Sequence, residues 1–272
     1  MGHHVAQKLR EAGHTVIGVD IKQADIVADL STGEGRQAAA AGVLAASGSR
    51  LDGAVLAAGL GPTQAADRAR LIAQVNYFGV VDLLEAWRPA LAAADRAKVV
   101  VFASNSTTTT PMVPARTVRA FLAHDADKAV RSVRLFGKNA SVFVYAASKI
   151  AVSRWVRRAA VTTEWAGAGI RLNALAPGPI MTPLLEESLS TPNEAKRIRS
   201  FPVPIGGFGD AGQLADWVLF MLSDAADFMC GSIVFVDGGS DAYFRADDWP
   251  RPVPAYRLLP YLKRFRRYSS SA

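Results

Sequence analysis

Tyr145 and Lys149 are the pair of side chains best suited to do chemistry in this sequence, where they occur in the run YAASK. On a helix, two residues four apart lie on the same face. A phenol ordinarily ionises near pH ~10, and a neighbouring ammonium group favours the phenolate and lowers that pKa. A tyrosine tuned in this way can exchange a proton with an alcohol or carbonyl oxygen. Alone, the spacing is a weak signal, because a surface helix pair has the same pattern.

Three further places in the sequence have polar or turn residues that could contribute to a site. Ser104 comes after the run KVVVFA, so we expect its hydroxyl at the carboxyl end of a buried strand, where open α/β sheets bind ligands. Asn76 lies inside a helical stretch, where asparagine is unfavourable, and it is equally consistent with a buried structural amide. Pro177 and Gly178 follow the run IRLNALA, which by itself indicates an ordinary turn.

Apolar runs alternate with helical spacing along the first 241 residues. The runs lack strict alternation, which is typical of strands buried on both faces. Expected strands are 14–19, 53–58, 98–103, 170–176 and 232–236, with helices including 2–12, 67–87 and 146–165. This order predicts one doubly wound, Rossmann-like parallel sheet over residues 1–241 and a proline-containing basic appendage over 242–272.

The composition excludes several classes of protein. Half of the 272 residues are apolar and a fifth are charged, so the chain is globular. A single cysteine, Cys230, excludes a disulfide framework and a cysteine-based zinc site, and we predict no metal centre. No apolar stretch reaches the ~18 residues of a membrane span, and no secretory leader is apparent, which favours a cytoplasmic protein.

The net charge of +7 is concentrated at one end. Residues 251–272 contain six Lys and Arg and no acid, which leaves +1 on residues 1–250. Nucleic-acid binding is therefore not expected of the body. The segment 257–267 mixes leucines and aromatics with cations, as interfacial helices do. Pro260 interrupts that segment, so a solvated tail is favoured over membrane-surface contact.

Taken in order, these motifs resemble the short-chain dehydrogenase/reductase family. The matching positions are Gly2 with its helix, Asp20, Asp29-Leu30, Ala57-Ala58-Gly59, Asn76, Ser104, Tyr145 with Lys149, Pro177-Gly178 with Thr182, and Asp237-Gly238-Gly239. The runs DLSTGEGR, AGLGP and VNYFG, and the 41 residues from Ser104 to Tyr145, resemble the bacterial 3α-hydroxysteroid dehydrogenase/carbonyl reductase branch. The resemblance implies an oxidoreductase acting on an apolar ketone or secondary alcohol, with a hydroxysteroid as one candidate, in a homodimer or homotetramer.

The resemblance also implies roles for particular residues. Tyr145 would be the general acid/base, Lys149 would lower its pKa and hold the nicotinamide ribose, Ser104 would position the substrate oxygen, and Asn76 would anchor a water. Cofactor contacts would come from Gly2, Asp20, Asp29, Leu30, Ala58, Gly59, Asn76, Tyr145, Lys149, Pro177, Gly178, Ile180 and Thr182. The family's mobile substrate loop would correspond to residues 181–204, with Met181, Leu184, Leu185, Leu189 and Phe201 as an apolar lining.

The choice of cofactor follows from charge. Asp20 ends the second expected strand, where a carboxylate accepts hydrogen bonds from a ribose diol and repels a 2′-phosphate. NAD is therefore favoured over NADP, with Lys22 as the nearby cation that softens the preference.

Two departures from the family pattern affect the prediction. A helical insertion over about 113–138 precedes Tyr145, and we expect it to form either the pocket rim or an oligomer interface. The family begins with a strand and a glycine turn whose final glycine aligns with Gly2. We therefore expect a gap of about 10 Å in the sheet, between the strand ending at Asp20 and the strand ending near Ala58. One hypothesis is that the active protein starts further upstream. The alternative is a truncated, non-catalytic dinucleotide-responsive binding protein.

Overall fold

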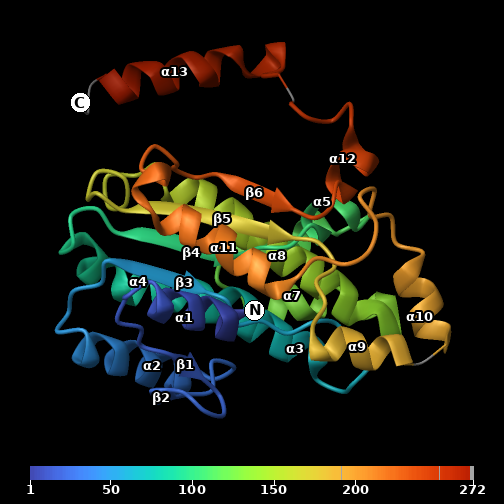
Figure 1. The fold of residues 1–272 in the computed structure, drawn as a ribbon. Helices are drawn as coiled ribbons and strands as arrows, with labels where there is room; N and C mark the ends of the chain where they lie inside the picture. The colour runs from blue at the N-terminus through green and yellow to red at the C-terminus, as the bar shows by residue number, and fades with distance from the viewer. Residues whose placement is uncertain (191, 251, 270–272) are drawn as a thin grey trace.

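Four parallel strands form the centre of the computed structural model, which describes residues 1–190, 192–250 and 252–269. They are β3 (Gly53–Leu56), β4 (Lys98–Phe102), β5 (Arg171–Pro177) and β6 (Ile233–Val236), hydrogen-bonded in that order (Figure 1). Every residue of β4 is buried, as are all residues of β5 after Arg171. Burial of both faces explains why these segments read as continuous apolar runs.

A second, two-stranded sheet lies beside the first. β1 (Val19–Asp20) pairs in parallel with β2 (Ile26–Val27), and no described strand joins β1 to β3. The expected break in the sheet is therefore present. The expected strand over 14–19 was too long, because only Val19 of that range is in a strand. Residues without a neighbouring strand on either side have no ladder of hydrogen bonds to hold them extended.

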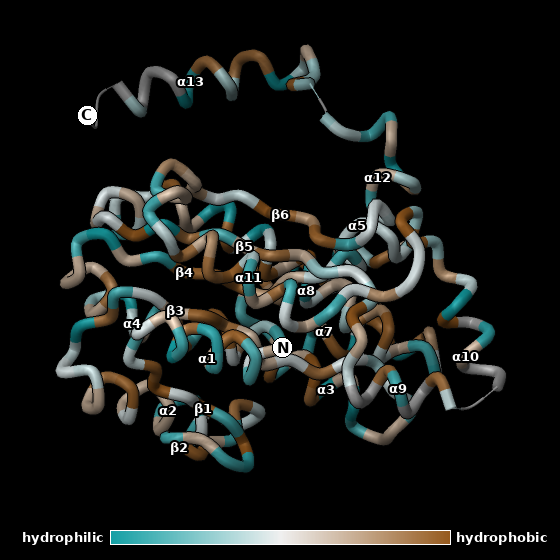
Figure 2. Tube along the Cα trace, in the orientation of Figure 1, coloured by the Kyte–Doolittle hydropathy of each residue, from teal (hydrophilic) through white to brown (hydrophobic). Residues whose placement is uncertain are grey.

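Helices cover both faces of the four-stranded sheet, which confirms the predicted doubly wound fold. On one face α1 (Gly2–Glu11) packs on α11 (Ala211–Leu222), and Val5 joins Phe102 and Leu175 in a common apolar cluster. The larger cluster on the other face includes buried residues of α2 (Gly33–Ala46), α4 (Gly79–Ala92) and α8 (Ala140–Ala159). Figure 2 shows the apolar segments concentrated in β3, β4 and β5 between these layers.

The expected insertion is helical and packs on α8. It consists of α6 (Ala115–Leu122), α7 (Ala126–Arg131) and the 3-10 helix η2 (Arg134–Asn139). Val118 and Phe121 of α6 are buried in the larger core. Asp82 of α4 accepts hydrogen bonds from Arg36 of α2 and from His124 of the insertion. The insertion is thus anchored to the body by apolar packing and by a polar bridge.

The remaining elements connect or follow the layers described above. They are α3 (Arg68–Ala73), the π-helix η1 (Gln74–Phe78), α5 (Ser106–Thr109), α9 (Pro183–Ser190), α10 (Pro192–Arg199), η3 (Asp224–Ala226), α12 (Ser240–Arg245), η4 (Ala255–Arg257) and α13 (Leu258–Ser269). Figure 1 shows α13 apart from the layered body, joined to it through α12. Among the described residues, no helix has the length and apolarity required to span a bilayer.

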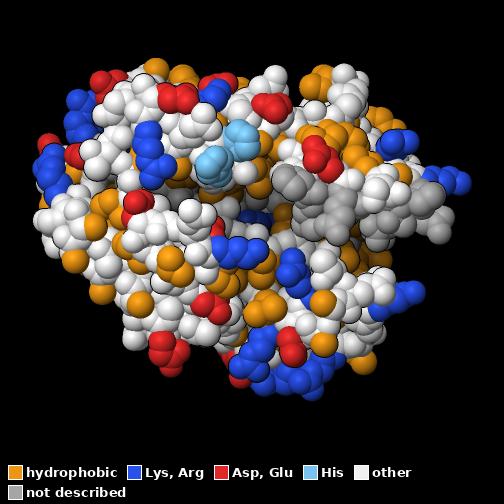
Figure 3. All heavy atoms as spheres, turned by 60° about the horizontal axis from the view of Figure 1, so that its bottom comes forward, with side chains coloured by type: hydrophobic (Ala, Val, Ile, Leu, Met, Phe, Trp, Pro, Cys, Tyr) orange, Lys and Arg blue, Asp and Glu red, His pale blue; other side chains and the backbone are white. Residues whose placement is uncertain are grey.

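The surface of the body carries charges of both signs. Figure 3 shows Lys and Arg interspersed with Asp and Glu over the face that it views, with several Lys and Arg together at the lower edge. This mixture agrees with the charge of +1 on residues 1–250.

Candidate active site

The carboxyl ends of β3, β4 and β5 bring the predicted site residues to one edge of the sheet. Gly59 follows β3, Ser104 follows β4, and Pro177 ends β5. The backbone N–H of Asn105 donates to the Pro177 carbonyl oxygen at 2.9 Å, which ties two of these chain segments together. The arrangement is the one in which open parallel sheets hold their ligands.

Asn76 lies in the π-helix η1, between α3 and α4. Such single widened turns occur frequently at functional sites. The side chain is fully buried, its Nδ2 donates to the Leu60 carbonyl oxygen at 3.0 Å, and its Oδ1 accepts from the Leu60 N–H at 2.8 Å. Asn76 therefore fixes the chain that leaves β3, and its carbonyl oxygen keeps a second lone pair.

The Ser104 side chain lies close enough to Tyr145 to influence the pKa of the phenol. The Ser104 Oγ accepts from the Ser106 N–H at 3.1 Å. Burial raises the pKa of Tyr145 above its usual value, and Ser104 acts in the opposite direction more weakly. Tyr145 is consequently a protonated phenol at neutral pH.

Lys149 lies one turn further along α8 and is 5% exposed. Its Nζ donates to the Phe102 carbonyl oxygen at 2.6 Å, at the end of β4. Burial lowers the pKa of Lys149 to about 8. The ammonium form still predominates at neutral pH, with two of its three donors remaining for other groups.

The pKa of Tyr145 lies above its usual value, whereas the sequence predicted a lowered one, and a lowering influence of Lys149 on that pKa stays a prediction. Burial is the dominant influence on Tyr145, and the opposing influence comes from Ser104. The hydrogen bond from Lys149 goes to Phe102 instead of the phenol.

Gly59 adjoins both Asn76 and Lys149. A Cβ atom built on Gly59 would lie 3.5 Å from Asn76 Oδ1 and 3.8 Å from Lys149 Nζ. Since Lys149 and Tyr145 share α8 and Tyr145 contacts Ser104, the structure gathers all four predicted tetrad residues at one edge of the sheet.

The predicted adenosine-side residues lie along the ends of β1 and β2. Asp20 ends β1, is exposed, and its Oδ1 accepts from the Lys22 N–H at 3.0 Å. The Asp29 Oδ1 accepts from the Ser31 N–H at 2.8 Å, and the Leu30 carbonyl oxygen accepts from Arg36 at 3.0 Å. Asp29 and Leu30 are therefore also parts of a well-ordered turn before α2.

Gly2 and Ala58 lie near the carboxyl end of β3. Gly2 begins α1, and a Cβ built on it would lie 3.3 Å from the Cβ of Ala57, just after β3. Ala58 and Gly59 are exposed beside this point. A helix amino terminus placed there presents unpaired N–H groups of the kind that bind phosphate.

The predicted nicotinamide-side residues form the turn after β5. A Cβ on Gly178 would lie 2.7 Å from the Cα of Asp237, so only glycine fits there. Ile180 makes an isolated parallel bridge with Gly209. Thr182 Oγ1 accepts from the Leu185 N–H at 3.3 Å and so lies at the beginning of α9.

The expected apolar substrate lining belongs to the segment that contains α9 and α10. Met181, Leu185, Leu189 and Phe201 are half-buried, and the side chain of Leu184 lies outside the described residues. An apolar lining of this kind suits a large hydrophobic substrate.

Two buried polar atoms without partners lie next to Ser104. They are Asn105 Nδ2 and Ser106 Oγ. An unpaired buried polar group costs about 1–3 kcal/mol, so this edge of the sheet is suited to a polar ligand that would satisfy it. The exposed Asp20 carboxylate and the amino end of α1 are likewise suited to the ribose and phosphates of a dinucleotide.

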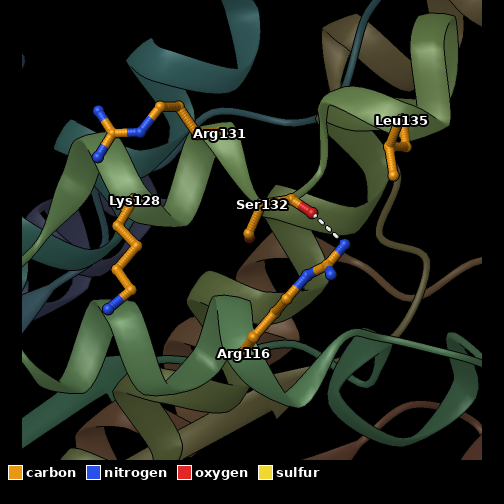
Figure 4. A pocket seen from close by; sticks show the side chains of 5 residues that line it. All are labelled: Arg116, Lys128, Arg131, Ser132 and Leu135. Carbon is orange, nitrogen blue, oxygen red and sulfur yellow. Dashed lines mark hydrogen bonds between the residues drawn. The ribbon is translucent and has the colours of Figure 1, made fainter.

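A surface pocket on the insertion is separate from the predicted site. Arg116, Lys128, Arg131, Ser132 and Leu135 line it, and none of the tetrad residues does. Figure 4 shows the Arg116 guanidinium donating to the Ser132 carbonyl oxygen while Arg131 points away. This pocket is a cationic surface feature of α6, α7 and η2.

Sequence reasoning missed the backbone partners of the site. Leu60, Phe102 and Ser106 hold the tetrad side chains through main-chain groups. Main-chain N–H and C=O groups are the same in nearly every residue, so the sequence does not show which of them hold the site; only the fold does. The poor helix propensity of Asn76 was the one available indication of the π-helix.

Comparison with known proteins finds similar chains that span nearly the whole body. The family described as enoyl-(acyl carrier protein) reductase matches residues 128–241. The 3-alpha-hydroxysteroid dehydrogenase/carbonyl reductase of Comamonas testosteroni is 37% identical over 246 residues, covering 90% of this chain and 94% of that protein. A glucose 1-dehydrogenase of Gluconobacter oxydans is 36% identical over 99 residues, covering 36% of each chain.

A solved structure is similar over the same extent. The 3-alpha-hydroxysteroid dehydrogenase from Pseudomonas sp. B-0831, complexed with NADH, has a TM-score of 0.82 and 42% identity. The match covers 90% of this chain and 94% of that one.

Proposed function

This chain belongs to the short-chain dehydrogenase/reductase family, and we propose that it transfers a hydride between a nicotinamide dinucleotide and an apolar ketone or secondary alcohol. The observation that carries the proposal is the contact of Tyr145 with Ser104 at the carboxyl end of β4, beside Lys149 and Asn76. Family membership favours this catalytic function over a non-catalytic binding protein.

A hydroxysteroid is the substrate class that we propose within this activity. The similar proteins from Comamonas and Pseudomonas are named for 3-alpha-hydroxysteroids. In this chain the half-buried Met181, Leu185, Leu189 and Phe201 supply an apolar lining. Apolar contacts fix few details of a ligand, so other hydrophobic carbonyl compounds remain within the proposed class.

In carbonyl reduction, Tyr145 would act as the general acid. Its raised pKa keeps the phenol protonated at neutral pH, ready to donate to the carbonyl oxygen. The Ser104 Oγ accepts from the Ser106 N–H, which leaves its own proton to point at Tyr145 or at the substrate oxygen. The bound dinucleotide would supply the hydride.

Lys149 and Asn76 would support the proton transfer. The Lys149 ammonium uses one donor for Phe102, so the other two can reach ribose hydroxyls. Its positive charge would also stabilise the phenolate that remains on Tyr145 after the proton has left. The free lone pair of the Asn76 carbonyl oxygen can accept from a relay water.

We propose NAD as the dinucleotide. The Asp20 carboxylate ends β1, and one of its oxygens is already held by the Lys22 N–H. The other oxygen can accept from a ribose hydroxyl, whereas a 2′-phosphate at the same place would be repelled. Gly2, Asp29, Leu30, Ala58 and Gly59 would complete the adenosine and phosphate contacts, and Pro177, Gly178, Ile180 and Thr182 the nicotinamide contacts.

We further propose that residues 1–241 act as one cytoplasmic catalytic domain and that the chain forms a homo-oligomer. The half-exposed Trp217 and Phe220 on α11 favour self-association, because large apolar side chains on a surface commonly mark protein contacts.

The test of the function is a screen of NADH and NADPH oxidation against a panel of ketones. We expect turnover of apolar ketones, including a 3-oxo steroid, with NADH preferred. Failure of every apolar ketone, with both dinucleotides, would reject the proposed activity.

A further inference from the structure

The C-terminal helix α13 has no role in the proposed catalysis. It spans Leu258–Ser269, packs on η4, and stands apart from the layered body (Figure 1). The segment to which it belongs contains Arg251, Arg257, Lys263, Arg264, Arg266 and Arg267, with no acid between residues 249 and 272.

Helical spacing separates two kinds of side chain on α13. Tyr261 and Leu262 lie three and four residues after Leu258, so the three side chains share one face, while Lys263 and Arg264 lie outside it. Leu258 is 55% exposed and Leu262 is 45% exposed. A helix with an exposed apolar face bordered by cations is the pattern of a helix that lies in a membrane interface.

Pro260 does not interrupt this helix, contrary to expectation. It is the third residue of α13. The first four N–H groups of a helix have no partner within the helix, so the missing N–H of proline costs nothing there. The prediction of a solvated tail rested on a helix break at Pro260, and the structure has no such break.

We propose that α13 binds the surface of an anionic lipid bilayer. The apolar face would enter the headgroup region and the cations would pair with anionic headgroups. A nucleic acid would neutralise the cations but leave the apolar face uncovered. A second copy would bring six more cations of the same sign. The body is nearly neutral, and on the face in Figure 3 its acidic side chains are interspersed with Lys and Arg.

The segment before α13 fits the same orientation. Trp249 and Tyr256 are 67% and 79% exposed, and such aromatic residues favour the interface of a bilayer. Further back, α12 is fixed to the body: Ser240 Oγ donates to the Pro202 carbonyl oxygen at 2.7 Å, and Arg245 pairs with Asp241. A bound α13 would therefore hold the body to the membrane through α12, next to the end of the substrate segment.

Sedimentation of the full chain with vesicles tests this proposal. The vesicles are phosphatidylcholine alone or phosphatidylcholine with phosphatidylglycerol. We expect binding that requires phosphatidylglycerol and weakens as salt increases. Each cation near an anionic surface contributes roughly a fivefold factor, so Lys263→Glu/Arg264→Glu should weaken binding at least about twentyfold.

Matched variants on the insertion provide the controls. Arg134→Glu/Lys138→Glu makes the same change in net charge at exposed positions of η2 and should bind vesicles as the parent does. Leu258→Gln/Leu262→Gln should also lose binding, whereas Leu135→Gln, at a residue that is 91% exposed on η2, should not.

Three results would overturn the proposal. The first is equal vesicle binding by the parent and by Lys263→Glu/Arg264→Glu. The second is loss of vesicle binding in both charge variants, on α13 and on η2. The third is vesicle binding by Leu258→Gln/Leu262→Gln equal to that of the parent, in a chain that also binds duplex DNA. None of these measurements uses substrate, so they stand or fail independently of the proposed oxidoreductase activity. Ketone reduction in vesicle-free buffer should be the same for all four variants.

Discussion

The Lys149 ammonium donates to the Phe102 carbonyl oxygen across 2.6 Å, which joins the middle of α8 to the end of β4. This bond places a buried cation at the edge of the sheet where Ser104 and Tyr145 meet. Burial lowers the pKa of Lys149 from 10.5 to about 8. The lowered pKa of Lys149 therefore affects the stability of the fold as well as the proposed chemistry.

Between about pH 8 and pH 10.5 the unfolded chain keeps the Lys149 proton and the folded chain loses it. The free energy of unfolding should therefore rise with pH, by about 1.4 kcal/mol per unit and about 3 kcal/mol over the window. Lys149→Met removes this contribution. Denaturant unfolding of both proteins should show the parent gaining stability relative to the variant as pH rises. A constant difference would contradict the burial of the ammonium.

Gly59→Val should impair the proposed site without unfolding the chain. The side chain would project between Asn76 Oδ1 and Lys149 Nζ, where a Cβ already lies 3.5 and 3.8 Å away. We expect kcat/KM for ketone reduction to fall by about tenfold or more. Gly61→Val is the control, because nothing lies within 4 Å of a Cβ at Gly61. Equal activity of the two variants would remove Gly59 from the site.

Asp20→Ser should shift the dinucleotide preference toward NADPH. Without the carboxylate, the 2′-phosphate is no longer repelled and the ribose diol loses an acceptor. We expect the ratio of kcat/KM for NADH to that for NADPH to fall by about tenfold or more, which corresponds to about 1.4 kcal/mol. Asp52→Asn changes an exposed carboxylate elsewhere and should leave the ratio unchanged. A ratio that stays constant in Asp20→Ser would show that Asp20 does not select the cofactor.

Gly178→Ala should destabilise the fold at the turn after β5. The new Cβ would lie 2.7 Å from the Cα of Asp237, so the β5 and β6 ends must separate. We expect a loss of roughly 1–3 kcal/mol in the free energy of unfolding. Gly33→Ala, at the first residue of α2 with nothing within 4 Å, should be neutral or slightly stabilising. Thermal or denaturant unfolding of both variants decides this, and a Gly178→Ala protein as stable as the parent would contradict the contact.

Residue types and periodicity were sufficient to predict the layered fold, and the resemblance to the family predicted the break in the sheet. Strands such as β4 consist of apolar residues that are buried on both faces, so their sequence shows them directly. The strand over 14–19 was overestimated because an apolar run does not reveal whether a neighbouring strand is present to pair with it. Secondary structure at that point depends on the rest of the sheet.

The electrostatics of the site depended on contacts that residue spacing cannot show. The spacing of Tyr145 and Lys149 correctly placed both residues on α8, but burial reversed the expected direction for the tyrosine pKa. In the same way, Pro260 suggested a helix break because the start of α13 could not be located from sequence alone. In both cases the surroundings of the residue, which its type and spacing do not reveal, decided its effect.

In the proposed ketone reduction, Tyr145 donates the proton to the carbonyl oxygen. The direct measurement is steady-state NADH oxidation with an apolar ketone by the parent, by Tyr145→Phe, and by Tyr77→Phe as a control for a second buried tyrosine. We expect Tyr145→Phe to lower kcat by about 10²–10⁴-fold with NADH binding, followed by fluorescence, unchanged, and we expect Tyr77→Phe to remain active. A Tyr145→Phe enzyme that retains the parental kcat would contradict this role of Tyr145.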